Sequence, residues 1–282
     1  YGNVDPSCLE PWEHTELYRN LANELNSPHN KALGNALNFL IIRGDYEKRV
    51  LVFNVFEMNG AIVKQLKNLS EKIATQIDKG VVSCHSFHDP DCSRFYFDTR
   101  NPDVKLRLKT LYGPGKMEVT FGDHKFRFVP TIFSQINGSM VPTMISRARH
   151  LLSPFSNSHL VDLFCGYGLF SHALASAFAH VIGIEANEES ARAAIENGKT
   201  NRTAEKIRIY IARISRGTIT NCLSRVNCHP EFFFCDPPRQ GMDQSAIAEV
   251  CARRPETIVL ACCGTDAIPG QVNAFRRGGY AL

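Results

Sequence analysis

The sequence lacks the features that mark several classes of protein. No stretch approaches the roughly 20 consecutive apolar residues that a membrane-spanning helix needs, so we expect no membrane partner. The net charge of +4 over 282 residues is compatible with nucleic-acid binding but too small to indicate it alone. The ten cysteines are scattered, which excludes the disulfide framework of a small secreted domain. We therefore expect free thiols and a reducing, intracellular compartment.

The Cys-x-x-Cys pairs of many zinc sites are also missing. The stretch CHSFHDPDC offers Cys84, His85, His88 and Cys92 as donors. Its spacing fits a strand followed by a loop better than a zinc site. We assign no metal to the chain.

Residues 36–130 have the pattern of a small α+β domain. ALNFLIIRGDYEKRVLVFNVFEM contains two apolar runs around the polar turn at residues 44–47, which predicts a hairpin. Apolar residues then recur at helical spacing over residues 61–77. Further strands are predicted in 80–88, 94–99, 104–113 and 116–129. VKLRLKT and KFRF alternate apolar with basic residues, which fits either a solvated face or an RNA-binding face. Residues 1–35 form an N-terminal segment that we predict to be helical.

Residues 131–282 alternate strands with helices. HLVDLF, HVIGIEA, KIRIYIA, EFFFCDPP and TIVLAC are apolar strand patterns, and helical stretches separate them. Continuous apolar strands joined by helices indicate a parallel, doubly wound α/β sheet. The sequence therefore predicts a Rossmann-like domain after the smaller α+β domain.

A glycine loop follows the first of these strands. VDLFCGYGLF places Gly166 and Gly168 between a strand and a helix, where a ligand can approach the backbone. Glu185 ends the next strand, 185 − 166 = 19 residues later, where a carboxylate accepts hydrogen bonds from ribose hydroxyls. Ser171 and His172 stand where a dinucleotide loop has its third glycine. The loop thus favours S-adenosyl-L-methionine over NAD, and the alternative is a domain that has kept its fold and lost its ligand.

A rigid polar loop follows the strand EFFFC. Asp236, two prolines and Arg239 come next, and the prolines end the strand sharply. Ligands bind at this carboxyl edge of a parallel sheet. A guanidinium such as Arg239 can bind a phosphate or a base edge with two hydrogen bonds. The alternative is a tight turn with a surface arginine.

Six motifs together resemble the RNA 5-methyluridine methyltransferases, the tRNA and 23S rRNA uracil-5-methyltransferases. They are FVPTIFSQIN, VDLFCGYGLF, VIGIEAN, ENGKTN, DPPRQG and IVLACC. The resemblance covers roughly residues 36–282, and it implies an RNA-binding domain followed by a class I methyltransferase domain. It implies tRNA or rRNA as the partner, within a ribosomal assembly particle as one possibility. The implied cofactor is S-adenosyl-L-methionine. Together, the resemblance and the glycine loop give the cofactor-binding residues Gln135, Phe164, Gly166, Gly168, Glu185 and Asp236.

The resemblance also implies the chemistry. In this family the strand after DPPR ends in a nucleophilic cysteine, which corresponds to Cys263, and Cys262 takes the place of a serine. A thiolate that adds to C6 of uracil makes C5 nucleophilic toward the methyl group. The expected catalytic residues are Cys263, Asp236 and Arg239. Because successive strand residues face opposite sides, we expect only Cys263 to face the site and Cys262 to be buried.

Several departures from the family keep a second hypothesis open. Gly264 and Thr265 replace the Asn-Pro that follows the family's cysteine. The family's general base, a glutamate, would lie beyond Leu282, so we expect the chain to continue there. The alternative function is a catalytically impaired, methyltransferase-like RNA-binding or ribosome-assembly factor. These departures, and a first residue that is not methionine, favour a mitochondrion over the cytoplasm or nucleus.

Overall fold

The computed structural model describes residues 12–45, 47–90, 92, 108–135, 137–224 and 230–281. Contacts between residues divide the chain into two compact units. The first unit is Tyr1–Val119 with Val129–Thr131, and the second is Thr120–Phe128 with Ile132–Leu282. The second unit thus takes in a short segment that precedes residue 131, where the sequence led us to expect the domain boundary.

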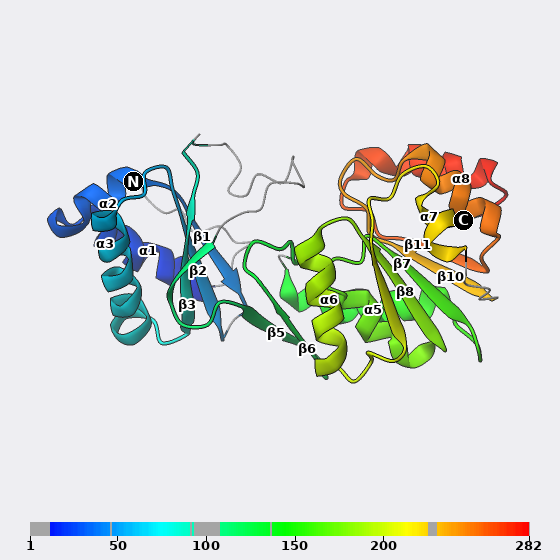
Figure 1. Cartoon of the computed structure of the whole chain (residues 1–282), viewed down its shortest axis with the longest axis horizontal. Helices are drawn as coiled ribbons and strands as arrows, with labels where there is room; N and C mark the ends of the chain where they lie inside the picture. The colour runs from blue at the N-terminus through cyan, green and yellow to red at the C-terminus, as the bar shows by residue number, and fades with distance from the viewer. Residues whose placement is uncertain are drawn as a thin grey trace. The chain divides into compact units, whose positions relative to one another are not determined.

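The first unit contains a four-stranded sheet with helices on one face (Figure 1). Its helical segments are α1 (Trp12–Asn26), a 3₁₀ turn (Pro28–Asn30), α2 (Lys31–Ala36), α3 (Gly60–Lys72) and a π-helical turn (Ile73–Ile77). Its strands are β1 (Leu37–Gly44), β2 (Arg49–Val55), β3 (Val81–His88) and β4 (Leu108–Tyr112), in that order across the sheet. The predicted hairpin of β1 and β2 is confirmed, and the predicted helix begins with Asn59 as its cap. The strand predicted at 94–99 and the residues before Trp12 lie outside the described residues.

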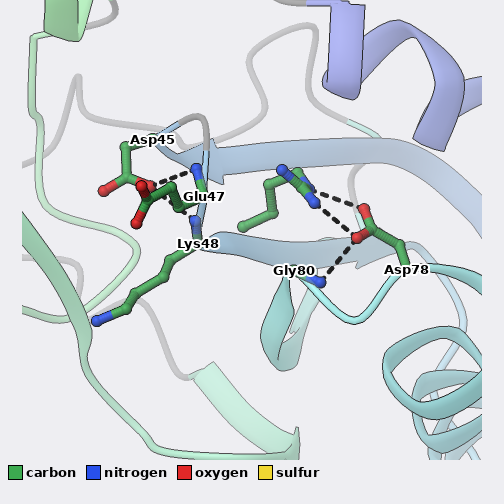
Figure 2. A network of polar contacts seen from close by, with 6 residues as sticks. Asp45, Glu47, Lys48, Asp78 and Gly80 are labelled. Carbon is green, nitrogen blue, oxygen red and sulfur yellow. Dashed lines mark hydrogen bonds and ion pairs between the residues drawn. The ribbon is translucent and has the colours of Figure 1, made fainter.

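A buried ion pair fixes the β2–β3 end of this sheet. Arg49, at the start of β2, donates from Nε to Asp78 Oδ2 at 2.7 Å and from Nη2 to Oδ1 at 2.6 Å. Gly80 N also donates to Asp78 Oδ1, at 2.8 Å (Figure 2). Burial acts against the carboxylate, but the hydrogen bond from Arg49 leaves the pKa of Asp78 lowered. The two-bond geometry and the small exposure make this pair stronger than an ordinary surface salt bridge.

The second unit is a doubly wound sheet, which confirms the predicted fold class. Its strands are β7 (His159–Leu163), β8 (His180–Glu185), β9 (Ile207–Ile211), β10 (Glu231–Cys235) and β11 (Thr257–Leu260). They lie in the order β11-β10-β7-β8-β9, and all pairs are parallel. The order reverses between β7 and β10, and sheets of this kind bind ligands beyond the carboxyl ends of the strands at such a reversal.

Helices cover both faces of this sheet (Figure 1). One face packs against α7 (Thr218–Leu223), α8 (Gln244–Arg253) and α9 (Ile268–Arg277), the last preceded by a 3₁₀ turn (Thr265–Ala267). The other carries α4 (Val141–Leu152), which follows a 3₁₀ turn (Gly138–Met140), then α5 (Leu169–Leu174), a 3₁₀ turn (Ala175–Ala177) and α6 (Glu188–Thr200). The three central strands β7, β8 and β10 are almost entirely buried, as their apolar sequences require, whereas the outer strands β9 and β11 are partly exposed.

A hairpin of β5 (Met117–Phe121) and β6 (His124–Phe128) completes the fold, with the predicted turn at Gly122 and Asp123. Phe126 and Phe128 are buried, and the ring of Phe128 stacks on Tyr167 with centroids 4.3 Å apart. The hairpin thereby packs against the glycine loop of the second unit. No helix in the described part of the chain is long and apolar enough to span a membrane.

Candidate active site

The backbone of the glycine loop is left-handed at three positions. Phe164, directly after β7, has φ of +63°, and Gly166 and Gly168 have φ of +55° and +86°. A residue other than glycine rarely adopts this left-handed conformation, and such strain concentrates at functional sites. Phe164 N and Cys165 N both donate to the carbonyl of Ile184, at 2.9 and 3.3 Å. The turn is therefore attached to the end of the neighbouring strand β8.

Glu185 lies where the sequence analysis places it, at the end of β8 beside this loop. Its Oε2 accepts from Gly166 N at 2.9 Å, and its Oε1 accepts from Asn187 N at 2.7 Å. Burial raises the pKa of Glu185, and these amide donors act in the opposite direction. Each carboxylate oxygen keeps a second lone pair, so the group can still accept hydrogen bonds from a ligand's hydroxyls.

Gln135 and Asp236 come from distant parts of the chain and meet. Gln135 Nε2 donates to Asp236 Oδ2 at 3.3 Å. Asp236 directly follows β10, and burial raises its pKa to about 6. The pair brings two predicted residues together at the same sheet edge as the glycine loop.

The loop that follows β11 contacts the DPPR loop. Ala261 N donates to Cys235 O at 2.8 Å, and a methyl group added to Gly264 would lie 3.0 Å from the carbonyl oxygen of Arg239. Partial burial raises the pKa of the Cys263 thiol, Asp236 adds to the rise, and Arg239 opposes it. Asp236 and Arg239 therefore both lie within electrostatic range of Cys263.

The expectation about the two cysteines is wrong in one respect. Strand β11 ends at Leu260, before either of them, so strand alternation does not set their directions. Both Cys262 and Cys263 are exposed, and Cys262 is not the buried neighbour that we expected. Beyond Leu260, Ala261 N still donates to Cys235 O of the neighbouring strand at 2.8 Å, and the two cysteines follow outside the strand.

The structure shows buried polar residues near the site to which the sequence analysis gave no role. Asp162 in β7 is 1% exposed and accepts from Ser171 Oγ at 2.5 Å. Burial raises its pKa to about 7, the Ser171 hydrogen bond lowers it, and the charges of Asp236 and Glu185 raise it further. The sequence did contain a signal for Asp162, because a carboxylate inside an otherwise apolar strand is unusual. His172 is also buried in the core and is not a site residue.

The four residues considered as zinc donors are not assembled. Cys84 is in the hydrophobic core, whereas His85 is bonded to Ser83 Oγ and to Thr110 Oγ1. His88 and Cys92 are exposed. Within the described ranges, no three His, Cys, Asp or Glu side chains gather as a metal site. Two surface hollows, one on α4 and one between α7 and α8, include none of the site residues.

The parallel sheet with this glycine loop and acid defines a class I methyltransferase domain. The model of the tRNA (uracil-5-)-methyltransferase family matches residues 98–275, and the chain belongs to this family. The resemblance drawn from the six motifs is thereby confirmed. S-adenosyl-L-methionine is the cofactor that the family and the fold imply.

Related proteins extend this similarity. The chain is 34% identical to the tRNA (uracil(54)-C(5))-methyltransferase of Schizosaccharomyces pombe over 152 residues, which cover 51% of this chain and 28% of that protein. It is 26% identical to the 23S rRNA (uracil(1939)-C(5))-methyltransferase RlmD of Acinetobacter baumannii over 252 residues, 86% of this chain and 49% of that one. The chain spans less than half of the length of these curated relatives.

A solved structure shares the fold. The tRNA (uracil-54, C5)-methyltransferase of Pyrococcus abyssi, in complex with S-adenosyl-L-homocysteine, superposes with a TM-score of 0.62. Its sequence is 17% identical, and the match covers 83% of this chain and 52% of that chain.

The loop has room for the implied cofactor. A methyl group added to Gly166 would meet no atom within 4 Å, whereas one added to Gly168 would lie 2.7 Å from His172 Nε2. Gly166 thus faces open space beside the Glu185 carboxylate, and Gly168 faces the packed core. These observations fit a nucleoside whose ribose is held by Glu185.

Proposed function

We propose that this chain is an RNA methyltransferase that moves a methyl group from S-adenosyl-L-methionine to C5 of a uridine in tRNA or rRNA. The observation that carries the proposal is the convergence of the site at one sheet edge. Glu185 and the glycine loop, the Gln135–Asp236 pair, and Cys263 near Arg239 all lie there. Family membership and the relatives' uracil substrates support the substrate class.

The residues of the glycine loop would hold the cofactor. Glu185 is suited to accept hydrogen bonds from the ribose hydroxyls. The backbone at Phe164 and Gly166 would let the cofactor lie close to the loop. Gln135 and Asp236 would lie between the cofactor and the target base. When bound, S-adenosyl-L-methionine supplies an electrophilic methyl group on a positively charged sulfur.

Cys263 would activate the uracil. C5 of uracil is a weak nucleophile, and addition of a thiolate to C6 moves the electron pair of the 5,6 double bond toward C5 and the O4 carbonyl. After C5 gains the methyl group it loses its proton to a base, the double bond re-forms, and the thiolate leaves C6. The target nucleotide must be unstacked to reach Cys263, as in other enzymes that act on a base.

Electrostatics at the loop decides when the thiolate forms. The pKa of Cys263 is raised by partial burial and by Asp236, so most of the thiol is protonated at neutral pH in the RNA-free protein. Arg239 is exposed beside it and lowers that pKa. We assign Arg239 two roles: it favours the thiolate, and it offers a cationic fork to a phosphate or to the uracil edge.

A covalent trap tests the proposal. RNA that contains 5-fluorouridine cannot lose a proton from C5, so an active enzyme should stay bonded to it after methylation. The full-length protein with labelled S-adenosyl-L-methionine should form an adduct that survives denaturing electrophoresis. Cys263→Ala should abolish the adduct, and Cys262→Ala, the matched control on the same exposed loop, should keep it.

The second candidate function is an RNA-binding scaffold without catalysis. The raised pKa of Cys263 and the Gly264-Thr265 sequence beside it are the observations that favour it. RNA binding without an adduct and without methyl transfer by the full-length protein would support the scaffold and refute the enzyme.

A further inference from the structure

Asn197, in α6, connects the glycine loop to the hairpin strand β6. It is 0% exposed, and its side-chain amide has a partner on each side. Oδ1 accepts from Arg127 N in β6 at 2.8 Å, and Nδ2 donates to the carbonyl of Tyr167 at 3.1 Å. A buried amide with both ends bonded is costly to replace, because any change leaves a polar partner unsatisfied.

Asn201, one helical turn later, makes a similar contact with the hairpin but does not reach the loop. Its Oδ1 accepts from Lys125 N at 2.9 Å, and its Nδ2 donates to Lys125 O at 2.8 Å. The two side chains thus bond the backbone of β6 along α6, as a neighbouring strand would. Among the side-chain bonds described for these two residues, the one to the glycine loop comes from Asn197.

The bond from Asn197 fixes the orientation of one peptide unit. The carbonyl of Tyr167 points to Asn197, while the amide of Gly168 in the same peptide donates to Cys165 O at 2.9 Å. A peptide that precedes a glycine can flip at little cost, because glycine tolerates either sign of φ. The bond to Asn197 opposes this flip in the loop where Gly166 faces open space.

We propose that Asn197 is a positioning residue for cofactor binding. It holds the Tyr167–Gly168 peptide in the orientation that leaves Gly166 and Glu185 open to the ligand, and it ties that orientation to strand β6. The stacking of Phe128 on Tyr167 supports the same arrangement from the hairpin side. The inference rests on the proposed function, because it concerns the same cofactor site.

Two matched substitutions test it in the full-length protein. Asn197→Asp keeps an acceptor for Arg127 N but replaces the donor to Tyr167 O with an oxygen. Asn201→Asp makes the same atomic change on the same helix and affects only the hairpin and the helix backbone. Binding of S-adenosyl-L-homocysteine is measured by calorimetry, and thermal unfolding of each variant is recorded beside it.

We expect Asn197→Asp to weaken S-adenosyl-L-homocysteine binding about tenfold, as for the loss of one buried hydrogen bond, and Asn201→Asp to change it less than about twofold. Equal affinity of Asn197→Asp and wild type, or an equal loss in both variants, would overturn the inference. Absence of binding by the wild type would instead overturn the proposed function, and the inference with it.

A measurement on the wild type decides the case if Asn197→Asp does not fold. We consider the arrangement in which Asn197 bonds both Tyr167 O and Arg127 N. A ligand that binds only this arrangement slows the exchange of every amide that must break it to exchange, by up to about 100-fold at a ligand concentration of 100 times Kd. Amide exchange followed by NMR should therefore slow at Arg127 N on addition of S-adenosyl-L-homocysteine, and more than at Lys125 N. Equal slowing at the two amides, or none at Arg127, would refute a specific connection through Asn197.

Discussion

Alanine at Gly166 should mainly weaken ligand binding, whereas alanine at Gly168 should mainly lower stability. Both glycines have positive φ, +55° at Gly166 and +86° at Gly168. Their surroundings differ, because a Cβ at Gly166 meets nothing within 4 Å, whereas a Cβ at Gly168 lies 2.7 Å from His172 Nε2 and 3.1 Å from Ala194 Cβ. His172 cannot move away easily, since it is bonded to Ala194 O and Thr203 Oγ1.

The magnitudes follow from these contacts. A left-handed alanine costs about 1 kcal/mol, and this is the whole expected cost of Gly166→Ala. Gly168→Ala adds overpacking against a fixed core side chain, typically about 2 kcal/mol, for a total of about 3 kcal/mol. The difference corresponds to roughly 4–8 °C in the melting temperature of a unit of this size.

Scanning calorimetry of both variants measures this difference, and titration with S-adenosyl-L-homocysteine measures binding. We expect Gly166→Ala to melt higher than Gly168→Ala yet to lose at least about tenfold in affinity, because its new methyl group occupies the ligand's space. If the two variants have the same melting temperature, the described packing of Gly168 against His172 is wrong. If Gly166→Ala binds as well as wild type, the open space beside Glu185 does not hold the cofactor.

Three further predictions concern ionisable groups. Burial lowers the pKa of His172 to about 4, so between about pH 6.5 and pH 4 the unfolded chain binds a proton that the folded chain does not. The free energy of unfolding of wild type should therefore fall by up to about 1.4 kcal/mol per pH unit over this range. Denaturation at pH 7, 6 and 5 should show this slope in wild type and not in His172→Gln, and parallel profiles would contradict it. Asp78→Asn should destabilise the first unit by about 2 kcal/mol in the same assay, because it weakens a buried pair with Arg49, and a change below about 0.5 kcal/mol would make the pair a surface-like contact. Arg239→Ala should slow iodoacetamide alkylation of Cys263 about two- to threefold at low salt and less at high salt, because Arg239 lowers the pKa of that thiol. An effect that does not depend on salt, or no effect, would show that Arg239 does not help to form the thiolate.

The helices and strands of the second unit were largely predictable. Its central strands β7, β8 and β10 are largely apolar, and the parallel sheet buries both faces of them, so the local pattern and the tertiary environment agree there. The cap at Asn187 was predictable for the same reason: its side chain accepts from Ser190 N at 2.8 Å, a bond formed within four residues. The end of β11 was not, because apolar residues continue past Leu260 and no residue there signals the end of a strand.

The site divides in the same way. The glycine loop and Glu185 could be predicted as a pair because they lie at the ends of adjacent strands, at a spacing that one strand–helix–strand unit fixes. Asp236 could be placed at the sheet edge because it follows an apolar strand, whereas Gln135 was predicted only from the family resemblance. No local rule brings the two together, since 101 residues separate them. Asn197 was quoted within a motif but without a role, since its two partners are 30 and 70 residues away.

The sequence by itself determined the class of fold, the position of the glycine loop and the carboxylate beside it. Periodicity and strand ends are local properties, and they survive in the folded chain wherever burial follows the same pattern. Only the tertiary structure decided that both cysteines are exposed, that Gly166 faces open space while Gly168 faces His172, and that Asn197 holds the loop. Each of these depends on atoms brought together from separate elements, and packing fixes such contacts where local preference does not.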